Sequence, residues 1–438
     1  MKKSIIVALT ICLVLTLAGC SFRTVDQMYC LPKRSQAYDQ LQLQLDHAMQ
    51  GRTYCAPLSG ENQQTVQLAD LDGDGEKEYL LFCLSADSLL QILIFDAVGE
   101  GYELRDTIEG HGYAFDRVEY VQMDDRPGLE LIVGKQLSDQ VLRVVSVYTF
   151  ANGEAKQLLS TNYTRFLTSD LDGDDIGELL VLRPGQADTD NGIAELYAMK
   201  DGNMERYNEA PMSEPVDKLK RIIPGKLHGG QNAVFVASSV AESAIITDVY
   251  ALLNGQLINV SLSNESGTSV QTLRNYYVYA EDIDSDGEVE LPDLITMMPL
   301  DEGSTAQQQY LIRWYAMANN GAEKDKVYTY HNYLGGWYLR LEKRWADRIS
   351  VRAEEGGYGF YLWDETFSQA LKIFSIYELT GQNREEQAMK DNRFVLHRSE
   401  SILYCARLEV ASGSINISQE DMVDSFALIH QQWNTGEM

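Results

Sequence analysis

The sequence predicts a mainly β protein made of repeated units, followed by a smaller domain with a different pattern. Three observations predict this fold class. An acidic loop recurs at nearly even intervals within residues 60–334. Strand-like apolar runs flank the copies of this loop and end in turn residues. Residues 335–438 lack the loop, but they keep strand-like runs and end in one helix-like segment.

The acidic loop is clearest within residues 66–82, VQLADLDGDGEKEYLLF. Its positions 1, 3, 5 and 9 carry carboxylates, on Asp70, Asp72, Asp74 and Glu78. Such a loop suits Ca²⁺, which takes about six to eight oxygen ligands, including a backbone carbonyl at position 7, here Glu76. Gly75 at position 6 permits the sharp turn. The alternative is an acidic, solvated hairpin without metal.

The loop is repeated along the chain. Aligned on position 9, the copies end at Glu78, Glu130, Glu178, Ala233 and Glu290, at intervals of 52, 48, 55 and 57 residues. A period of about 50 residues with about four strand-like runs per unit is typical of propeller blades. Hairpin turn sequences such as Asn152-Gly153 and Asn254-Gly255 support it. The sequence therefore predicts a β-propeller of about five visible blades.

The five copies are not equally suited to metal. In the third, Asp175 replaces the glycine, and we expect a weaker but occupied site. In the second, Arg126 and Pro127 replace a ligand and the glycine, and we expect no metal. The turn at 225–233 lacks carboxylates and should be bare. The residues expected to bind Ca²⁺ are Asp70, Asp72, Asp74, Glu76, Glu78, Asp170, Asp172, Asp174, Ile176, Glu178, Asp282, Asp284, Asp286, Glu288 and Glu290.

These loops resemble those of the FG-GAP and VCBS repeat family, with Glu in place of the last Asp of the D-x-D-x-D-G-x-x-D loop. The resemblance covers about residues 60–325. It implies a propeller fold with Ca²⁺ bound between adjacent strands of a blade. Repetition of the loop favours a structural metal over a catalytic one. The resemblance implies no single activity, because propellers support many unrelated functions.

The N-terminus predicts export. Two lysines precede an uncharged run over residues 4–17, and residues 1–19 fit a signal peptide. The sequence LAGC at 17–20 resembles the bacterial lipobox, which implies cleavage before Cys20 and lipid on its thiol. The alternatives are an ordinary secretory signal or an uncleaved anchor helix. We expect a lipid-anchored protein outside the cytoplasmic membrane.

After Cys20, a tether leads to a short helix that Ser35 could cap and Gly51 could end. The alternating LQLQL sequence within it would also fit a strand. Cys30 and Cys55 bracket this helix, so a disulfide between them is possible outside the cell. No CxxC pair or Cys/His cluster suggests zinc.

Composition agrees with a folded, acidic, extracellular protein. Apolar residues make up 45% of the chain, which excludes the disordered class. The net charge of −29 opposes binding to nucleic acid and anionic surfaces.

Residues 335–438 predict a separate α+β domain, an antiparallel sheet with one helix. Gly335-Gly336 marks its start, and Ser418 with Asp421 caps its helix. The expected apolar stripe of that helix is Met422, Val423, Phe426, Ile429 and Trp433. The WYLxL…W opening of this segment, with the alternating strands after it, resembles PsbP/Mog1-type domains. That resemblance implies a binding or accessory domain with no catalytic residues.

Two further features have alternative interpretations. An aromatic group could form a sugar platform, but strand packing is favoured; its members are Tyr328, Tyr330, Tyr333, Trp337, Tyr338 and Trp345. His397 and His430 are isolated histidines, and we assign them no role.

The predicted function is that of a calcium-stabilised binding or scaffolding lipoprotein for a protein or glycan ligand. No nucleophile elbow, phosphate loop or HExxH motif occurs, and no catalytic residue is assigned. One alternative is a propeller enzyme that acts on cell-wall or environmental glycan through two carboxyls about 5–9.5 Å apart in a cleft. Another is a structural spacer without a clear pocket. The predicted division is signal peptide 1–19, tether and helix 20–59, propeller 60–334 and α+β domain 335–438.

Overall fold

The structure, a computed structural model, describes residues 36–99, 101–138, 142–185, 190–241, 244–300, 309–409 and 417–429. It contains six antiparallel sheets. The first has β1 (Arg52–Tyr54), β2 (Val66–Ala69), β3 (Glu78–Ser85), β4 (Leu90–Val98) and β5 (Gly101–Gly110). The second has β6 (Ala114–Val121), β7 (Glu130–Gln136), β8 (Arg143–Ala151) and β9 (Glu154–Tyr163). The third has β10 (Arg165–Ser169), β11 (Glu178–Pro184), β12 (Gly192–Lys200) and β13 (Asn203–Pro211).

The fourth sheet has β14 (Leu219–Lys226), β15 (Asn232–Ala241), β16 (Ala244–Leu253) and β17 (Gln256–Asn259). The fifth has β18 (Glu290–Thr296), β19 (Tyr310–Met317), β20 (Glu323–Asn332), β21 (Trp337–Leu341) and β27 (Phe426–Leu428). The sixth has β22 (Ile349–Glu354), β23 (Gly357–Trp363), β24 (Ala370–Thr380), β25 (Phe394–Arg398) and β26 (Ile402–Leu408). The helices are α3 (Gln36–Ala48), α4 (Arg384–Ala388) and α5 (Gln419–Ser425), with 3₁₀ turns η1 (Val216–Lys218), η2 (Val270–Thr272) and η3 (Lys343–Trp345).

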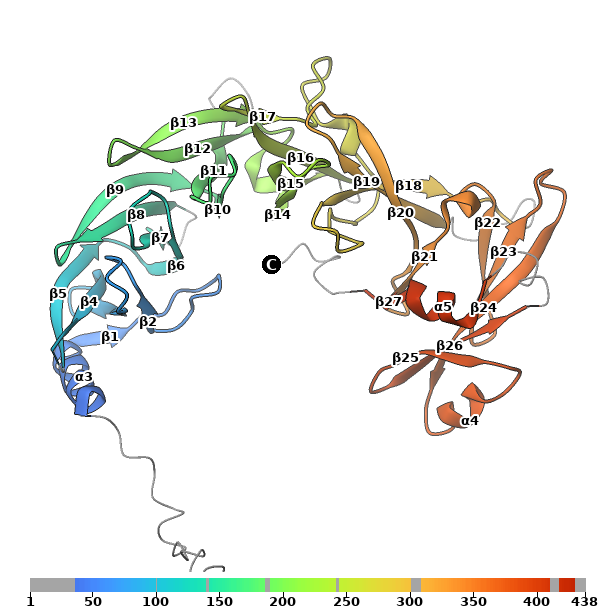
Figure 1. Cartoon of the computed structure of the whole chain (residues 1–438), viewed down its shortest axis with the longest axis horizontal. Helices are drawn as coiled ribbons and strands as arrows, with labels where there is room; N and C mark the ends of the chain where they lie inside the picture. The colour runs from blue at the N-terminus through green and yellow to red at the C-terminus, as the bar shows by residue number, and fades with distance from the viewer. Residues whose placement is uncertain are drawn as a thin grey trace, which may run out of the picture.

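The six sheets follow one another along an arc, and the first and sixth lie at its opposite ends (Figure 1). In the second, third and fourth sheets, the first strand lies on the concave side of the arc and the last on the convex side (Figure 1). The prediction of a mainly β fold made of repeated small antiparallel sheets is confirmed.

A separate hydrophobic core lies between each pair of adjacent sheets. In β11, Leu179 and Val181 pack against the second sheet, while Leu180 and Leu182 pack against the fourth. Successive side chains of a strand point to opposite faces, so a strand between two sheets buries both sets. This is why the inner strands read as continuous apolar runs.

Helices cover the outer faces of the two end sheets. Leu41 and Leu45 of α3 pack against Leu81 and Phe95 of the first sheet. At the other end, Ala388 of α4 packs with apolar side chains of the sixth sheet. The helix expected between Ser35 and Gly51 is therefore present, and it buries Leu41 and Leu45.

The sheet arrangement continues past the predicted boundary at residue 335. Gly335 and Gly336 form the turn between β20 and β21 of the fifth sheet, where Gly336 has a φ of 69°. The core between the fifth and sixth sheets joins Trp337 to Phe360 and Phe374. The glycine pair at the predicted domain boundary is thus a hairpin turn within one sheet. The sixth sheet packs on the fifth as the other sheets pack on their neighbours.

The C-terminal helix is shorter than predicted. Its cap is as expected, because Ser418 and Asp421 form a capping box. The helix ends at Ser425, and Phe426 begins β27, so Phe426 is not on a helical stripe. Pairing of β27 with β21 brings the Phe426 ring to 5.6 Å from that of Trp337. Val423 stays 41% exposed, which also contradicts the stripe.

The aromatic residues of this region behave as strand packing predicts. Trp337 is fully buried, and Tyr328, Tyr330, Tyr338 and Trp345 are buried as well. They line cores and do not form an exposed platform, and Tyr333 is half-buried, with its ring 5.4 Å from that of Tyr276. His397 is exposed on β25.

Several predictions fall outside the described residues, among them the signal peptide, Cys20, Cys30, His430 and Trp433. The lipid anchor and the pairing of Cys30 with Cys55 therefore stay predictions. Within the part of the chain that is described, no helix has the length and apolar character needed to span a membrane.

Candidate metal centres

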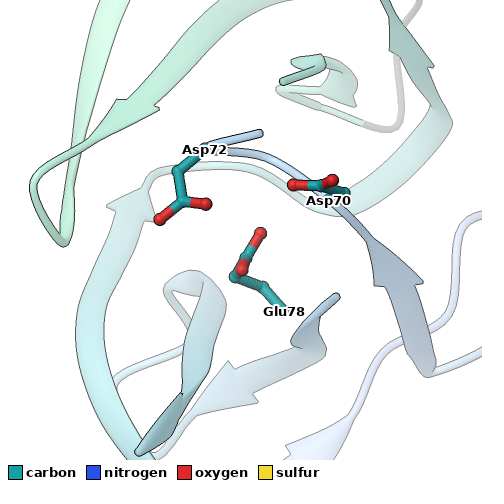
Figure 2. Close-up of side chains that lie close together, drawn as sticks. All are labelled: Asp70, Asp72 and Glu78. Carbon is teal, nitrogen blue, oxygen red and sulfur yellow. The ribbon is translucent and has the colours of Figure 1, made fainter. Parts of the chain in front are cut away.

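Three of the acidic loops bring carboxylates together. Their positions 1, 3 and 9 place ligand oxygens within 4.8 Å of one another, in the triads Asp70–Asp72–Glu78, Asp170–Asp172–Glu178 and Asp282–Asp284–Glu290. Figure 2 shows the first triad, in which Asp70 and Asp72 come from the loop and Glu78 from the start of β3. The position-5 residues Asp74, Asp174 and Asp286 lie outside these close triads. These carboxylate groups could bind a metal ion.

The glutamate at position 9 is the fixed part of each triad. It is the first residue of β3, β11 or β18, and Glu78 and Glu290 are completely buried. One carboxylate oxygen accepts the backbone N–H of position 2 in every case, with N–O distances of 2.6 Å for Leu71, 2.8 Å for Leu171 and 3.1 Å for Ile283. The strand and this hydrogen bond hold the carboxylate against the loop.

The second oxygen of this glutamate is the best indication of a cation. Oε1 of Glu78 and Oε1 of Glu290 are buried without a hydrogen-bond partner among the described residues. Oδ1 of Asp284 is in the same situation. A buried carboxylate oxygen without a hydrogen bond destabilises the folded protein. A hard divalent cation, which requires oxygen ligands, would remove this cost. The residues present therefore fit a metal ion.

The pKa values of the position-9 glutamates also indicate a cation site. Burial raises the pKa of Glu78 and of Glu178 to about 7, and the pKa of Glu290 to about 8. The neighbouring carboxylates raise these pKa values further, because like charges oppose ionisation. A bound divalent cation would reverse this effect and favour the ionised forms.

The loop backbone is organised as the sequence predicted. Position 6 has positive φ in all three loops: 91° at Gly75, 68° at Asp175 and 89° at Gly287. Its N–H donates to the carboxylate of position 1 at 3.0–3.1 Å, so that carboxylate is held by the turn itself. Asp175 adopts the left-handed conformation that glycine adopts in the other two loops.

The second loop keeps this framework but contains its own cation. Glu130 is 4% exposed, and its Oε2 accepts the N–H of Met123 at 2.9 Å. The Arg126 guanidinium binds Asp124 at position 3, with 2.7 Å between Nε and Oδ2. A side-chain cation thus pairs with a carboxylate that a metal would need, as expected for a metal-free loop.

The fifth loop has a competitor that the sequence did not reveal. Lys326 of β20 pairs with Asp286 at position 5 and lies 2.8 Å from Glu288 at position 7. Burial raises the pKa of Glu288, but hydrogen bonds from Lys326, Gly229 and His228 outweigh it and lower this pKa to about 2. Lys326 follows Asp286 by 40 residues, so no local pattern could have identified it.

The loops are also hydrogen-bonded from one sheet to the next. The N–H of position 8 donates to the position-1 carbonyl of the preceding loop, at 3.1 Å from Leu129 to Asp70 and at 2.8 Å from Gly177 to Gln122. Asn232 makes the equivalent contact through its side chain, at 2.6 Å from the Asp170 carbonyl. The residues that would bind metal are therefore connected directly to the neighbouring sheet.

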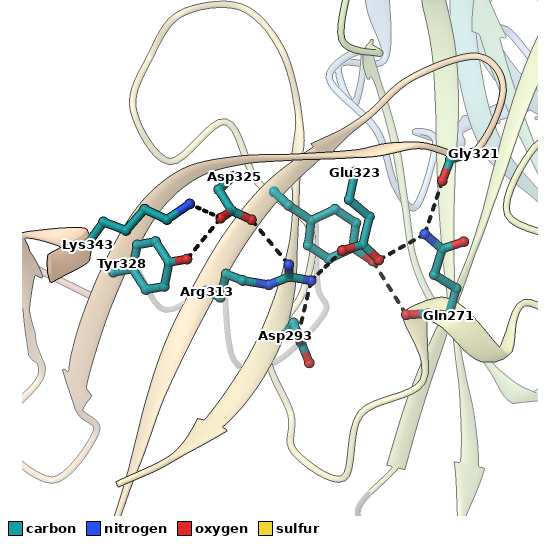
Figure 3. Close-up of polar contacts among 9 residues, drawn as sticks. Gln271, Asp293, Arg313, Gly321, Glu323, Asp325, Tyr328 and Lys343 are labelled. Carbon is teal, nitrogen blue, oxygen red and sulfur yellow. Dashed lines mark hydrogen bonds and ion pairs between the residues drawn. The ribbon is translucent and has the colours of Figure 1, made fainter. Parts of the chain in front are cut away.

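A second charged cluster lies on the fifth sheet (Figure 3). Arg313 binds Asp293, Glu323 and Asp325 at 2.5–3.2 Å, and Lys343 pairs with Asp325. The arginine and the lysine balance part of the charge of these three carboxylates. The cluster therefore stabilises the sheet and does not resemble the acid–base pair of a glycan hydrolase.

Comparisons with known proteins do not assign a family. No family model matches the chain, and no curated protein matches it. Among solved structures, it is similar to the exotype rhamnogalacturonan lyase YesX, with 12% identity and a TM-score of 0.31 over 74% of this chain. It spans 65% of that lyase and 72% of rhamnogalacturonan lyase YesW, to which it has 11% identity and a TM-score of 0.32 over 73% of this chain.

The β-propeller domain of the Trilobed protease from Pyrococcus furiosus is also similar, with 12% identity and a TM-score of 0.29 over 72% of this chain and 89% of that domain. Similarity at this level assigns no activity to the present chain.

Proposed function

We propose that this chain is an extracytoplasmic, lipid-anchored binding or scaffolding protein whose sheets are stabilised by Ca²⁺, of the FG-GAP/VCBS type. The main observation that supports the proposal is that each carboxylate triad lies on a loop that contacts the neighbouring sheet. A cation in the triad would fix the loop, and the loop would in turn fix two sheets relative to each other. A structural role for the metal follows from that position.

The experiment is thermal unfolding of the purified full chain in detergent, with Ca²⁺ and with EGTA. Ca²⁺ binds the folded loops and not the unfolded chain, so we expect EGTA to lower the melting temperature by more than about 5 °C. Mg²⁺ added in place of Ca²⁺ is the control, because it demands octahedral geometry and retains water. Equal melting temperatures in Ca²⁺ and EGTA would rule out a structural calcium.

Binding is tested by exposing the full chain to cell-wall glycans and secreted proteins, with product analysis of every glycan. We expect a complex and no change in the glycan. New reducing ends or unsaturated products would instead establish the glycan-acting enzyme and overturn the proposal. The absence of any complex would leave only a spacer role.

A further inference from the structure

A cavity of about 510 Å³ lies between the second and third sheets, at the strand ends opposite the acidic loops. On β11, for example, Glu178 at one end belongs to the third loop, and Arg183 near the other end lines the cavity. Seven residues of strand separate the two ends by about 20 Å. The cavity is therefore distinct from the candidate metal centres.

Arginines gather at this cavity although the chain as a whole is strongly acidic. Arg143, Arg183 and Arg206 line it, against the carboxylates Glu195 and Glu209. Arg165 adjoins it, directly after the lining residue Thr164. A positive cavity in a protein of net charge −29 is a local feature that the overall composition does not explain.

A buried carboxylate positions two of these arginines. Glu195 is 1% exposed, and one of its oxygens binds both Arg183 and Nη1 of Arg206, the latter at 2.9 Å. Tyr197 donates to the other oxygen at 2.9 Å. Nη1 of Arg206 also binds Glu209 at 3.0 Å, whereas Arg183 contacts Glu195 through one terminal nitrogen and keeps its other N–H groups for a second acceptor.

The positive charges of the other two arginines, Arg143 and Arg165, are balanced less fully by carboxylates. Nη1 of Arg143 and Nη1 of Arg165 both donate to the carbonyl of Thr164, at 3.4 and 3.0 Å. Asp116 lies 3.7 Å from Nε of Arg143, but it also accepts hydrogen bonds from the Tyr163 hydroxyl and a glutamine. Burial and the nearby Arg143 lower the pKa of Arg165, as expected for neighbouring cations. An anion between them would relieve this repulsion.

We propose that this cavity binds the carboxylate of an extracellular ligand, with Arg143 and Arg165 as the main contacts. Its volume is within the range of small-molecule sites, and Leu142, Pro184 and Ile193 provide apolar surface beside the charges. This inference rests on the proposed binding function and specifies its ligand chemistry. The carboxylate could come from a uronic acid of a glycan or from the C-terminus of a peptide, and the test separates the two.

The test is calorimetric titration of the full chain at saturating Ca²⁺. The glycan probes are trigalacturonate and its methyl ester, and the peptide probes are a tripeptide with a free and with an amidated C-terminus. We expect one free acid to bind, its neutral form to bind at least about tenfold more weakly, and affinity to fall as salt is added. Whichever acid binds identifies the source.

The variants are Arg143→Gln and Arg165→Gln, with Arg398→Gln as the matched control on the distant β25. Each cavity variant should weaken binding at least about tenfold, whereas the control should not change it. Thermal unfolding of each variant shows whether the fold is retained. If it is lost, Arg143→Lys, which keeps the charge, is used instead and should weaken binding less.

Equal affinity for the acid and its neutral form would overturn the inference, and so would full binding by a folded Arg143→Gln variant. If neither acid binds but the chain still captures another extracellular ligand, this inference fails and the proposed function stands. If Ca²⁺ also fails to stabilise the fold, the proposed function fails separately.

Discussion

The first and second acidic loops are two copies of one design that differ in how their negative charge is balanced. Glu78 and Glu130 are both buried, and both accept the N–H of position 2. The first loop has Asp70, Asp74 and Gly75 at positions 1, 5 and 6, where the second has Gln122, Arg126 and Pro127. The comparison indicates that the buried glutamate belongs to the sheet framework, while positions 1, 5 and 6 separate a loop suited to a metal ion from a loop that carries its own cation.

The largest expected effect comes from Glu78→Gln in the first loop. It removes a metal-binding charge and keeps the shape, so we expect the stability in Ca²⁺ to fall by about 3 kcal/mol and calcium stoichiometry to fall by one site. In EGTA the variant should be at least as stable as the parent, because an unpaired buried charge is removed. Thermal unfolding and calorimetry measure both quantities.

Glu130→Gln is the matched control in the second loop. It should leave the calcium stoichiometry unchanged. If both variants responded equally to Ca²⁺, the distinction between the loops would be wrong.

The reverse change would convert the second loop into a metal site. With Gln122→Asp, Arg126→Asp and Pro127→Gly together, the loop regains two ligands and a permissive turn, and we expect one additional bound Ca²⁺ with about 2 kcal/mol of calcium-dependent stabilisation. Arg126→Asp alone should bind more weakly, because proline keeps φ near −65°. Unchanged stoichiometry in the triple variant would show that other residues set the difference.

A smaller effect is expected at the fifth loop. Lys326→Met removes the ammonium that pairs with Asp286 and Glu288, and we expect the Ca²⁺ affinity of this loop to rise about tenfold, or about 1.4 kcal/mol. Lys390→Met, on an exposed lysine that pairs with Glu386, is the control. Titration of each variant measures the affinities, and a lower affinity in Lys326→Met would contradict the view of Lys326 as a competitor.

The smallest effect is the pH dependence of the metal-free protein. The folded-state pKa values of Glu78 and Glu290, about 7 and about 8, exceed the ordinary value of 4.5. Their contribution to stability is therefore complete below about pH 4.5 and is lost as pH rises to about 8. In EGTA we expect the melting temperature to be a few degrees lower at pH 8 than at pH 6. In Ca²⁺ this decrease should disappear, and its persistence would count against metal binding at these residues.

The sequence predicted the features that depend on residues close together in the chain. Positions 1, 3 and 9 converge in the three carboxylate-rich loops because they lie within nine residues of one another in a single turn. Lys326 and the bonds between successive loops could not be predicted, because stacking of the sheets sets them. Gly335-Gly336 was misassigned because a glycine pair fits both a linker and a hairpin turn. Phe426 was misassigned because its spacing from Met422 fits a continuous helix as well as a helix followed by a strand.

The arginine cavity had a signal that was missed. Three arginines lie at or near strand ends, at 143, 165 and 183, and Arg206 lies within the next strand but one, β13. Those strand ends are opposite the acidic loops. A comparison of charge at the two ends of the predicted strands would have indicated a positive region in an acidic protein.

Helices α3 and α4 have a consequence for assembly. Each covers the apolar surface on which a further sheet would otherwise stack. Growth of the array beyond six sheets, and stacking of two molecules end to end, would first require one of these helices to leave. The molecule is therefore a self-limiting stack, in the sense of the terminal units that stop repeat proteins from polymerising.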